Sequence, residues 1–438
     1  MISDKLSSSN TVRIVRRPRQ VARRWFASSV DFVVRRMNAD PIVVVGAGMA
    51  GGRAMDAMMR NADRPVFMLG TERLPPYNRP DLSKGYLLGA KNRTDLMLHA
   101  EDHYGDGTTG AHRQGTAVLG IDPERRDLCL GDGLPPLRYS QLLVATGATP
   151  RRLTVPGHQL AGIHYLRSAD DADDIRAGFR ARPRIAIVGS GLIGLEVAAA
   201  ARQRDLDVDV IEICKEPLTS LGHELAAAVR QFHEAAGVRF HFGVGVERFE
   251  GPGAVEQIVL SDGSLLQATL VVVGIGVIPE SSWLPAAVRH NETGAVVVNS
   301  FGETPIAGIY AAGDVCRWPH GVFGDLQVEH ETVAQNQGAH VALNMLGRRR
   351  AFEQVPYAWS DQYQHSLRSV GVTASGESDD IVPLSVGAGL MSLYVRDGRV
   401  TGGATLDADR SASRLMKIMR ATPAPKIDNS LIEQLLTA

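Results

Sequence analysis

The sequence is poor in cysteine, with three residues, Cys129, Cys214 and Cys316, among 438. They lie far apart and form neither a C-x-x-C nor a C-x4-C pattern, so we expect no disulfide framework, no zinc site and no other bound metal. Such a cysteine content fits a reducing cytosol, and we expect a cytoplasmic location. Uncharged apolar runs of about 18 residues, which a membrane-spanning helix needs, are also missing from the sequence. We therefore expect no membrane span.

Net charge is nearly absent too, because 47 Lys and Arg residues balance 48 Asp and Glu residues. Bulk charge thus argues neither for nor against a nucleic-acid or membrane partner, and we expect no nucleic-acid partner. A hydrophobic fraction of 44% and a charged fraction of 22% are ordinary for a globular protein. The length exceeds the usual limit of one hydrophobic core, so we expect two or three domains.

Residues 1–39 differ in composition from the rest of the chain. Between Thr11 and Arg36 there are eight arginines and one acidic residue, Asp31. The segment could be a transit-like amphipathic segment, a basic arm that contacts an acidic partner, or an unstructured tail, and translation could instead start at Met37. We favour a tail or a start at Met37.

The strongest pattern is a strand, a glycine turn and a helix. Ile42–Val45 are four β-branched residues, as in a parallel strand that is buried on both faces. Gly46, Gly48 and Gly51 then form G-x-G-x-x-G, and a helical pattern continues to about Met59. These glycines permit the tight turn, the approach of backbone to a pyrophosphate and the packing of helix on strand. The pattern predicts a dinucleotide site, against the alternative of a glycine turn without nucleotide.

The following segments support this interpretation. A second strand, Pro65–Leu69, precedes Glu72, which lies about 20 residues beyond the last glycine, where a carboxylate can bind ribose hydroxyls. Thr116–Arg138 is typical of a hairpin, with its turn at Gly131–Gly133. The strand Gln141–Gly147 ends in small residues, which allow a close approach to a ligand.

The same pattern then repeats. A strand over Arg184–Val188 leads into a second G-x-G-x-x-G over Gly189–Gly194, and the strand Val208–Ile211 ends at Glu212. The repeat predicts a second dinucleotide-binding site, unless one of the duplicated domains binds no nucleotide. An acidic residue at this position favours NAD over NADP, although Lys215 is close by.

Later segments complete the division into domains. Further strands are expected over Leu270–Pro279, Val296–Asn299, Ile309–Asp314, Ser366–Val372, Met391–Val395 and Val400–Thr405. We expect an α/β protein with two Rossmann-like dinucleotide-binding domains and a small C-terminal α+β domain. The expected ranges are 40–158 with 281–348 for the first domain, 159–280 for the second and 349–438 for the third.

Seven motifs together resemble the FAD-dependent, NAD(P)H-using ferredoxin reductases of the putidaredoxin- and rubredoxin-reductase type, in the pyridine nucleotide-disulfide oxidoreductase superfamily. They are Val44–Gly51, Pro76–Lys84, Ala145–Gly147, Gly189–Glu196, Gly274–Gly276, Tyr310–Asp314 and Trp359–Gln362. The resemblance covers about residues 40–438. Val328–His330 is more similar to the apoptosis-inducing-factor branch of flavoproteins.

The resemblance implies FAD and NADH as cofactors and assigns roles to individual residues. Lys84 beside flavin N5 and Glu196 near the nicotinamide are the implied catalytic residues. FAD would contact Gly46, Gly48, Met49, Ala50, Gly51, Glu72, Arg79, Val118, Asp314, Glu331 and Trp359. NADH would contact Gly189, Gly191, Leu192, Ile193, Gly194 and Glu212. Further residues are expected to contact a cofactor, without a division between the two: Ala145, Thr146, Gly147, Arg151, Gly276 and Gly313.

Three of these residues have simpler alternative interpretations. Lys84 could be an ordinary surface lysine, Trp359 a core aromatic residue, and Glu196 a carboxylate that only favours a helix dipole. Relatives usually carry an aromatic residue where this chain has Glu331, and an amide where it has Val333. The polar run 107–114 also departs from the expected strand. These departures leave FAD binding as expected but bear on the redox potential and the acceptor.

Reductases of disulfides with this architecture need a cysteine pair just after the second strand, and residues 72–116 contain no cysteine. Thiol–disulfide chemistry is therefore excluded. The first hypothesis is an NADH-dependent reductase, a monomer or homodimer, that passes single electrons to a small iron–sulfur protein, ferredoxin or rubredoxin, serving an oxygenase. The alternative is a redox-signalling or binding flavoprotein with slow turnover, similar to apoptosis-inducing factor.

Overall fold

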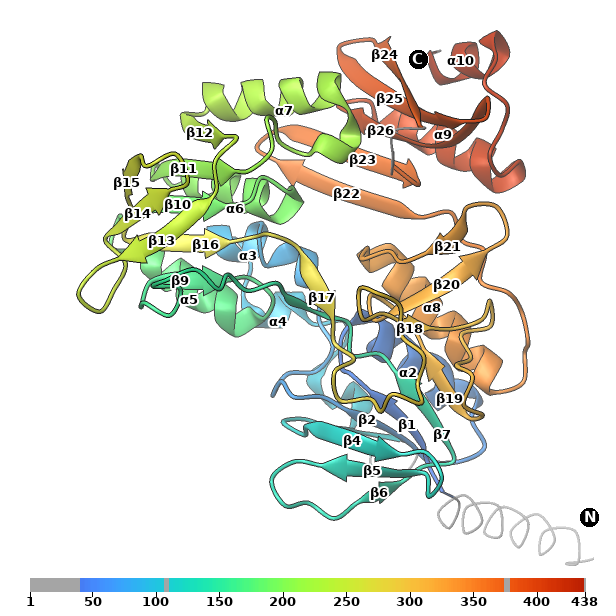
Figure 1. Ribbon diagram of the computed structural model, residues 1–438. Helices are drawn as coiled ribbons and strands as arrows, with labels where there is room; N and C mark the ends of the chain where they lie inside the picture. Colours follow the sequence, from blue (N-terminus) through green and yellow to red (C-terminus); the bar gives the residue numbers. More distant parts are fainter. Residues whose placement is uncertain (1–39, 106–109, 374–378, 437–438) are drawn as a thin grey trace, which may run out of the picture.

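The structure is a computed structural model that describes residues 40–105, 110–373 and 379–436. Three sheets with their covering helices form three lobes, and they follow one another around the molecule (Figure 1). The chain visits the first lobe, crosses to the second, returns to the first and ends in the third. The basic segment 1–39 and the start at Met37 lie outside the described residues. In the described part of the chain, no helix is long and apolar enough to cross a membrane.

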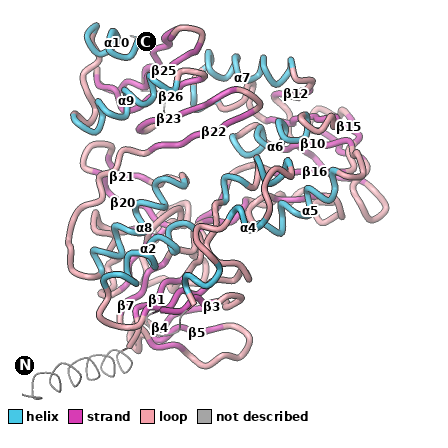
Figure 2. Tube along the Cα trace, turned by 180° about the vertical axis from the view of Figure 1, so that it is seen from behind, coloured by secondary structure: helices cyan, strands magenta, loops and turns pink. Residues whose placement is uncertain are grey.

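The first sheet is parallel, with the strand order β19-β7-β1-β2-β3. Its strands are β1 (Ile42–Val45), β2 (Val66–Leu69), β3 (Gly110–Arg113), β7 (Gln141–Val144) and β19 (Ile309–Ala311). Helices α2 (Met49–Asn61) and α8 (Glu331–Met345) lie side by side on one face (Figure 2). They approach closely because Gly338 has no side chain: a Cβ there would lie 2.1 Å from the Ala50 carbonyl oxygen.

The opposite face of the first sheet is covered by two small sheets, which share a hydrophobic core with it. One contains β4 (Val118–Asp122), β5 (Asp127–Leu130) and β6 (Leu137–Arg138), and the other contains β18 (Val296–Val297), β20 (Cys316–His320) and β21 (Gly324–Leu326). Burial on both faces explains the continuous apolar runs in β1 and β7. Between β2 and β4 the chain forms η1 (Arg79–Asp81), α3 (Gly85–Leu88), α4 (Arg93–Leu96) and η2 (Glu101–Tyr104).

The second sheet is also parallel, with the order β12-β11-β10-β16-β9. Its strands are β9 (Ile163–Tyr165), β10 (Arg184–Val188), β11 (Asp207–Glu212), β12 (Val238–Phe242) and β16 (Leu270–Val273). One face packs on α5 (Ala169–Phe179) and α6 (Leu192–Arg202), and the other on β13 (Val246–Glu250), β14 (Gln257–Leu260) and β15 (Leu265–Gln267). Strands β8 (Ala148–Pro150) and β17 (Val277–Pro279) pair where the chain passes between the two lobes.

The third sheet is antiparallel, with the order β22-β23-β26-β25-β24. Its strands are β22 (Tyr357–Gln362), β23 (His365–Gly371), β24 (Asp380–Val386), β25 (Gly389–Arg396) and β26 (Arg399–Leu406). One face is covered by α9 (Asp409–Ala421) and α10 (Asn429–Leu436). On the other face it meets η3 (Thr219–Leu221) and α7 (His223–Ala235) of the second lobe.

The expected fold class, two Rossmann-like folds with a small C-terminal α+β region, is confirmed. Several local expectations were incomplete. The strand expected over Leu270–Pro279 is two strands, β16 and β17, in different sheets. The first reversal in segment 116–138 falls between β4 and β5, where Arg126 has φ 57°, and Gly131–Gly133 starts the second reversal into β6. Strands β22 and β24 were not expected at all. We propose the same domain ranges as before, because β9–β16 form one sheet system and β22–β26 another.

Candidate functional site

A cavity of about 690 Å³ lies where the three lobes meet. Its wall contains residues at the carboxyl ends of β1, β7 and β19, the first turns of α2, α6 and α8, and part of β22. Carboxyl ends of parallel strands and helix N-termini are where open α/β folds bind nucleotides. The site therefore lies where the fold predicts it.

The first glycine turn forms one wall of this cavity. Gly46 has φ +113°, and a Cβ there would lie 2.1 Å from the Ala145 carbonyl oxygen. A Cβ on Gly51 would lie 1.9 Å from the Gly46 carbonyl oxygen, so the turn needs glycine at both positions. A Cβ on Gly48 would have no described heavy atom within 4 Å and would project into the cavity.

Helix α2 begins directly after this turn, and its described first turn carries neither an acidic residue nor a side-chain cap. Its backbone N–H groups are thus available to an anion, and the bare backbone of Gly48 allows close approach. These residues fit the pyrophosphate of a dinucleotide such as FAD.

A chain of charged hydrogen bonds follows one side of the cavity. The Arg79 guanidinium lies 2.5 Å from the Glu72 carboxylate, and the Tyr77 hydroxyl donates to Glu72 at 2.6 Å. Arg79 also donates to the Arg167 carbonyl oxygen at 2.8 Å, and the Arg167 guanidinium lies 3.3 Å from Asp314. Burial alone would lower the pKa of Arg79, but Tyr77 and Glu72 raise it above its ordinary value. Burial lowers the pKa of Arg167, with nearby Asp314 acting in the opposite direction. Because arginine stays charged in proteins, both side chains are cations beside the cavity.

Lys84 and Glu196 form an ion pair of 2.8 Å in the cavity wall. Lys84 follows η1, and Glu196 lies on α6 beyond its first turn, so the pair joins the first lobe to the second. The Ser83 hydroxyl donates to one Glu196 oxygen, and the Ser360 hydroxyl, from β22, donates to the other at 2.5 Å. All three lobes therefore position this carboxylate.

The Lys84 side chain is only 18% exposed, and that of Glu196 only 5%. The alternative of an ordinary surface lysine is therefore wrong. So is the alternative of a carboxylate that only favours the dipole, because α6 has no acidic residue in its first turn. Trp359 is half-buried and lines the cavity from β22, so it is not a core aromatic residue.

The start of α8 contributes Glu329, His330 and Glu331 to the wall. Burial raises the pKa of Glu331, and burial together with nearby Asp314 raises that of Glu329. Burial lowers the pKa of His330. Two acidic side chains, Glu329 and Glu331, thus lie in the cavity wall where the resemblance implies an aromatic residue at position 331.

The second glycine turn repeats the geometry of the first, with φ +101° at Gly189. Glu212, at the end of β11, accepts hydrogen bonds from the Ser190 amide at 2.8 Å, the Ser190 hydroxyl at 2.7 Å and the Cys214 amide at 2.9 Å. Burial alone would raise the pKa of Glu212, but these hydrogen bonds outweigh it and hold the pKa below its ordinary value. The carboxylate is therefore ionised and fixed next to the turn.

The structure divides the expected site residues into two groups. The cavity is lined by Gly46, Gly48, Met49, Ala50, Glu72, Arg79, Lys84, Val118, Ala145, Thr146, Gly147, Leu192, Ile193, Glu196, Gly313, Asp314, Glu331 and Trp359. The following lie outside its wall: Gly51, Arg151, Gly189, Gly191, Gly194, Glu212 and Gly276. The second group, apart from Gly51, Arg151 and Gly276, belongs to the expected NADH residues. The Arg151 amide donates to the Gly276 carbonyl oxygen at 2.9 Å, so these two residues lie side by side.

Sequence reasoning missed four residues that organise the site: Tyr77, Ser83, Arg167 and Ser360. The first two are neighbours of Arg79 and Lys84 in a single motif, and Ser360 follows Trp359, so motif membership could have identified them. Arg167 lies between β9 and α5, outside any motif. Only the folded structure brings it to Asp314.

Two dinucleotide folds that share one cavity, with a lysine–carboxylate pair between them, define an oxidoreductase that uses two nucleotide cofactors. The sequence profile of the pyridine nucleotide-disulphide oxidoreductases matches residues 40–342. The chain belongs to this family, and the predictions of the family and of an oxidoreductase are confirmed.

Relatives match over nearly their whole length. The chain is 34% identical to the ferredoxin–NAD(+) reductase component of an anthranilate 1,2-dioxygenase system from Burkholderia cepacia, with 89% of this chain and 96% of the relative covered. It is 32% identical to a rhodocoxin reductase from Rhodococcus erythropolis, with 88% and 90% covered. The structure of a covalent putidaredoxin reductase–putidaredoxin complex is similar with a TM-score of 0.84 at 28% identity, covering 91% of this chain and 98% of that one.

Proposed function

We propose that this protein is an FAD-containing NADH reductase that supplies electrons to a small iron–sulfur protein of an oxygenase system. The observation that carries this proposal is the Lys84–Glu196 pair, which lies in a cavity bounded by both dinucleotide folds. Only at such a place can two bound nucleotides meet. The names of the relatives from Burkholderia and Rhodococcus support a reductase function for this chain as well.

Bound FAD supplies the conversion of a two-electron hydride transfer into one-electron steps. The chain's own residues would hold it along the cavity. The turn Gly46–Gly51 and the N-terminus of α2 would receive the pyrophosphate, and Arg79 and Arg167 would add positive charge to the same cavity. Lys84 supplies a fixed cation in the cavity wall, where developing negative charge is stabilised more strongly than in water.

The second fold would bind NADH from outside the cavity. The turn Gly189–Gly194 and α6, whose described first turn is free of acidic residues, suit its pyrophosphate. Glu212 is positioned to accept from ribose hydroxyls and to repel a 2′-phosphate. Leu192, Ile193 and Glu196 line the cavity, so the nicotinamide end would enter it beside these residues.

For the electron acceptor, we propose a small iron–sulfur protein of the ferredoxin type, since a putidaredoxin reductase–putidaredoxin complex has the same fold at 91% coverage of this chain. Rubredoxin is the second possibility within the same chemistry. A cytoplasmic location and a monomeric or homodimeric state complete the proposal.

The proposal is tested by stopped-flow reduction of the FAD-loaded protein with NADH, followed by mixing with candidate ferredoxins and a rubredoxin. We expect rapid bleaching of the flavin by NADH and rapid reoxidation by at least one acceptor. Lys84→Gln should retain FAD but slow the bleaching roughly tenfold or more, as loss of one charged transition-state contact does. A reduced flavin that persists with bound NAD, and that no iron–sulfur protein reoxidises, would instead support the slow signalling flavoprotein.

A further inference from the structure

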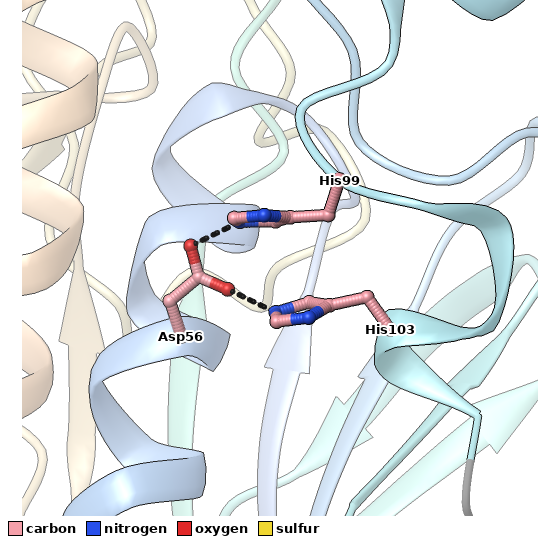
Figure 3. Close-up of side chains that lie close together, drawn as sticks. All are labelled: Asp56, His99 and His103. Carbon is pink, nitrogen blue, oxygen red and sulfur yellow. Dashed lines mark hydrogen bonds and ion pairs between the residues drawn. The ribbon is translucent and has the colours of Figure 1, made fainter.

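Three side chains that do not line the cavity meet on the surface of the first lobe (Figure 3). Asp56 lies in the middle of α2, His99 lies after α4, and His103 lies in η2. The two histidine rings are stacked with centroids 3.9 Å apart, and both point at the Asp56 carboxylate. The segment that carries the histidines is thereby joined to the helix whose first turn belongs to the cofactor cavity.

The distances define a compact group of ligand atoms. His99 Nε2 lies 2.9 Å from Asp56 Oδ2, and His103 Nε2 lies 2.9 Å from Asp56 Oδ1. One ligand atom from each of the three side chains can be chosen within 4.8 Å of the others. Among the described residues, this is the one set of three histidine, cysteine or acidic side chains so close together.

Burial distinguishes Asp56 from an ordinary surface carboxylate. Its side chain is 6% exposed, whereas those of His99 and His103 are 28% and 36% exposed. Charged groups that are buried to this degree are normally paired or coordinate a metal. The fixed carboxylate and the two more exposed rings allow the rings to turn towards a common point without any change in α2.

A fourth side chain, Tyr104, lies at the same place. The Tyr104 hydroxyl is buried and lies next to the Asp56 carboxylate. Its ring lies edge-on to both His103, at 4.6 Å, and His99, at 5.7 Å. Tyr104 thus packs beside all three side chains.

We propose that Asp56, His99 and His103 bind one divalent transition-metal ion of the zinc class, through both Nε2 atoms and one carboxylate oxygen. Two imidazoles and a carboxylate suit Zn²⁺ and its neighbours, whereas Mg²⁺ and Ca²⁺ prefer oxygen ligands alone. Three protein ligands leave room for water as the fourth. The ion would fasten the segment with His99 and His103 to α2.

The competing explanation is a network without metal, in which the Nε2–H groups of both histidines donate hydrogen bonds to Asp56. Arg53 lies 3.4 Å from Asp56 Oδ2 and favours that explanation, because a second cation nearby opposes a metal. It approaches one carboxylate oxygen only, however, and Oδ1 faces His103. The expectation that no metal is bound considered cysteine spacing and did not weigh these histidines.

The test is calorimetric titration of the untagged, chelator-treated, FAD-loaded protein with ZnCl2, with MgCl2 as the comparison. We expect one Zn²⁺ per chain, no saturable Mg²⁺ binding and a rise in the unfolding temperature with Zn²⁺. Co²⁺ should replace Zn²⁺ and give visible absorption bands. Zinc affinity should fall at least about tenfold in His103→Ala and in Asp56→Asn, because even an outer partner of a ligand contributes 10- to 100-fold.

The matched control is His223→Ala, since His223 is an exposed histidine 2.8 Å from a single carboxylate, Glu216. This variant should bind zinc as the native protein does. His103→Ala changes an exposed side chain, so its FAD content should stay stoichiometric even if Asp56→Asn misfolds. The proposal is wrong if Zn²⁺ does not bind saturably at micromolar concentration, or if His103→Ala binds it with unchanged affinity.

Discussion

The two glycine turns of this protein have nearly the same backbone but different surroundings. A Cβ on Gly46 would lie 2.1 Å from the Ala145 carbonyl oxygen, and a Cβ on Gly189 would lie 2.3 Å from the Gly274 carbonyl oxygen. At the middle glycines, Gly48 and Gly191, no described heavy atom lies within 4 Å of an added Cβ. The sequence motif thus specifies the turn itself in both lobes.

The two glycine turns differ in how far the surrounding protein encloses them. The first turn lies in the wall of the cavity, together with the ends of β7 and β19 and the start of α8. The second turn lies outside it, and only Leu192, Ile193 and Glu196 of α6 reach inside. An enclosed site suits a cofactor that stays bound, whereas an open one suits a nucleotide that must leave after each turnover. The motif specifies which kind of ligand binds, and the enclosure determines for how long.

The largest expected effect tests this difference directly. Gly48→Asp places a carboxylate in the cavity, against the pyrophosphate, and should release FAD almost completely. Gly191→Asp makes the same change in the open turn and should retain FAD while abolishing reduction by NADH. Flavin absorbance per chain and stopped-flow bleaching measure the two outcomes.

Each variant is the control for the other. If Gly48→Asp retains stoichiometric FAD, the first lobe does not hold the flavin. If Gly191→Asp loses FAD as well, the two turns are not independent and the comparison fails.

The next effect concerns the choice of nicotinamide nucleotide. Glu212→Ala removes the acceptor for ribose hydroxyls and leaves the Ser190 and Cys214 amides without their partner. Loss of a charge-assisted hydrogen bond costs about 1.5–3 kcal/mol, so kcat/KM for NADH should fall roughly tenfold or more. Use of NADPH should improve, since the repulsion of a 2′-phosphate is gone.

Glu212→Gln separates charge from geometry, because its amide oxygen can still accept from Ser190. It should keep part of the NADH activity and still gain NADPH activity. Kinetic constants with both nucleotides decide the matter, and a native protein that prefers NADPH would show that Lys215, rather than Glu212, controls the choice.

A smaller effect, on the rate of flavin reduction, is expected from the hydrogen bond between Ser360 of β22 and Glu196 of the second lobe. Ser360→Ala removes one hydrogen bond of 2.5 Å from Glu196, which keeps Lys84 and Ser83 as partners. We expect the rate of flavin reduction at saturating NADH to fall roughly threefold to tenfold, with little change in KM, as for the loss of a single positioning contact. Ser369→Ala is the matched control, because its buried hydroxyl has no partner among the described residues. Equal rates in the native protein and Ser360→Ala would show that β22 does not position Glu196.

The elements that depend on short stretches of sequence were predicted correctly. The strands β1 and β10, both glycine turns and the helices α2 and α6 follow from β-branched runs, glycine spacing and helical periodicity. Strand β22 was missed because Tyr357–Gln362 does not alternate cleanly between apolar and polar residues: Ser360 and Gln362 are buried there. Those polar residues face inward because their partners, Glu196 and His233, come from another lobe.

Roles that depend on contacts between distant segments could be assigned only through resemblance. The Lys84–Glu196 pair joins residues far apart in the sequence, and no spacing rule predicts its 2.8 Å contact. The same holds for Arg167 and Asp314. Glu212, in contrast, was placed correctly at the strand end, although the hydrogen bonds that it accepts from the Ser190 and Cys214 amides were not predicted.

The smallest expected effect is a pH dependence of stability at the contact between the second lobe and β22. His233 of α7 is fully buried and lies 2.8 Å from Gln362 Oε1, and burial lowers its pKa to about 4 from an ordinary 6.5. The unfolded chain therefore takes up a proton between pH 6.5 and 4, which the folded protein does not. The contribution of His233 to stability is fully present above pH 6.5 and falls as the pH is lowered through this window, by up to about 1.4 kcal/mol per pH unit.

His233→Gln should reduce this slope, although His112, whose pKa burial also lowers to about 4, still contributes. Denaturant unfolding at pH 7, 6 and 5 measures the slope, with the exposed His158→Gln as the control. An unchanged slope in His233→Gln would mean that the folded protein does not hold the pKa of His233 below its ordinary value.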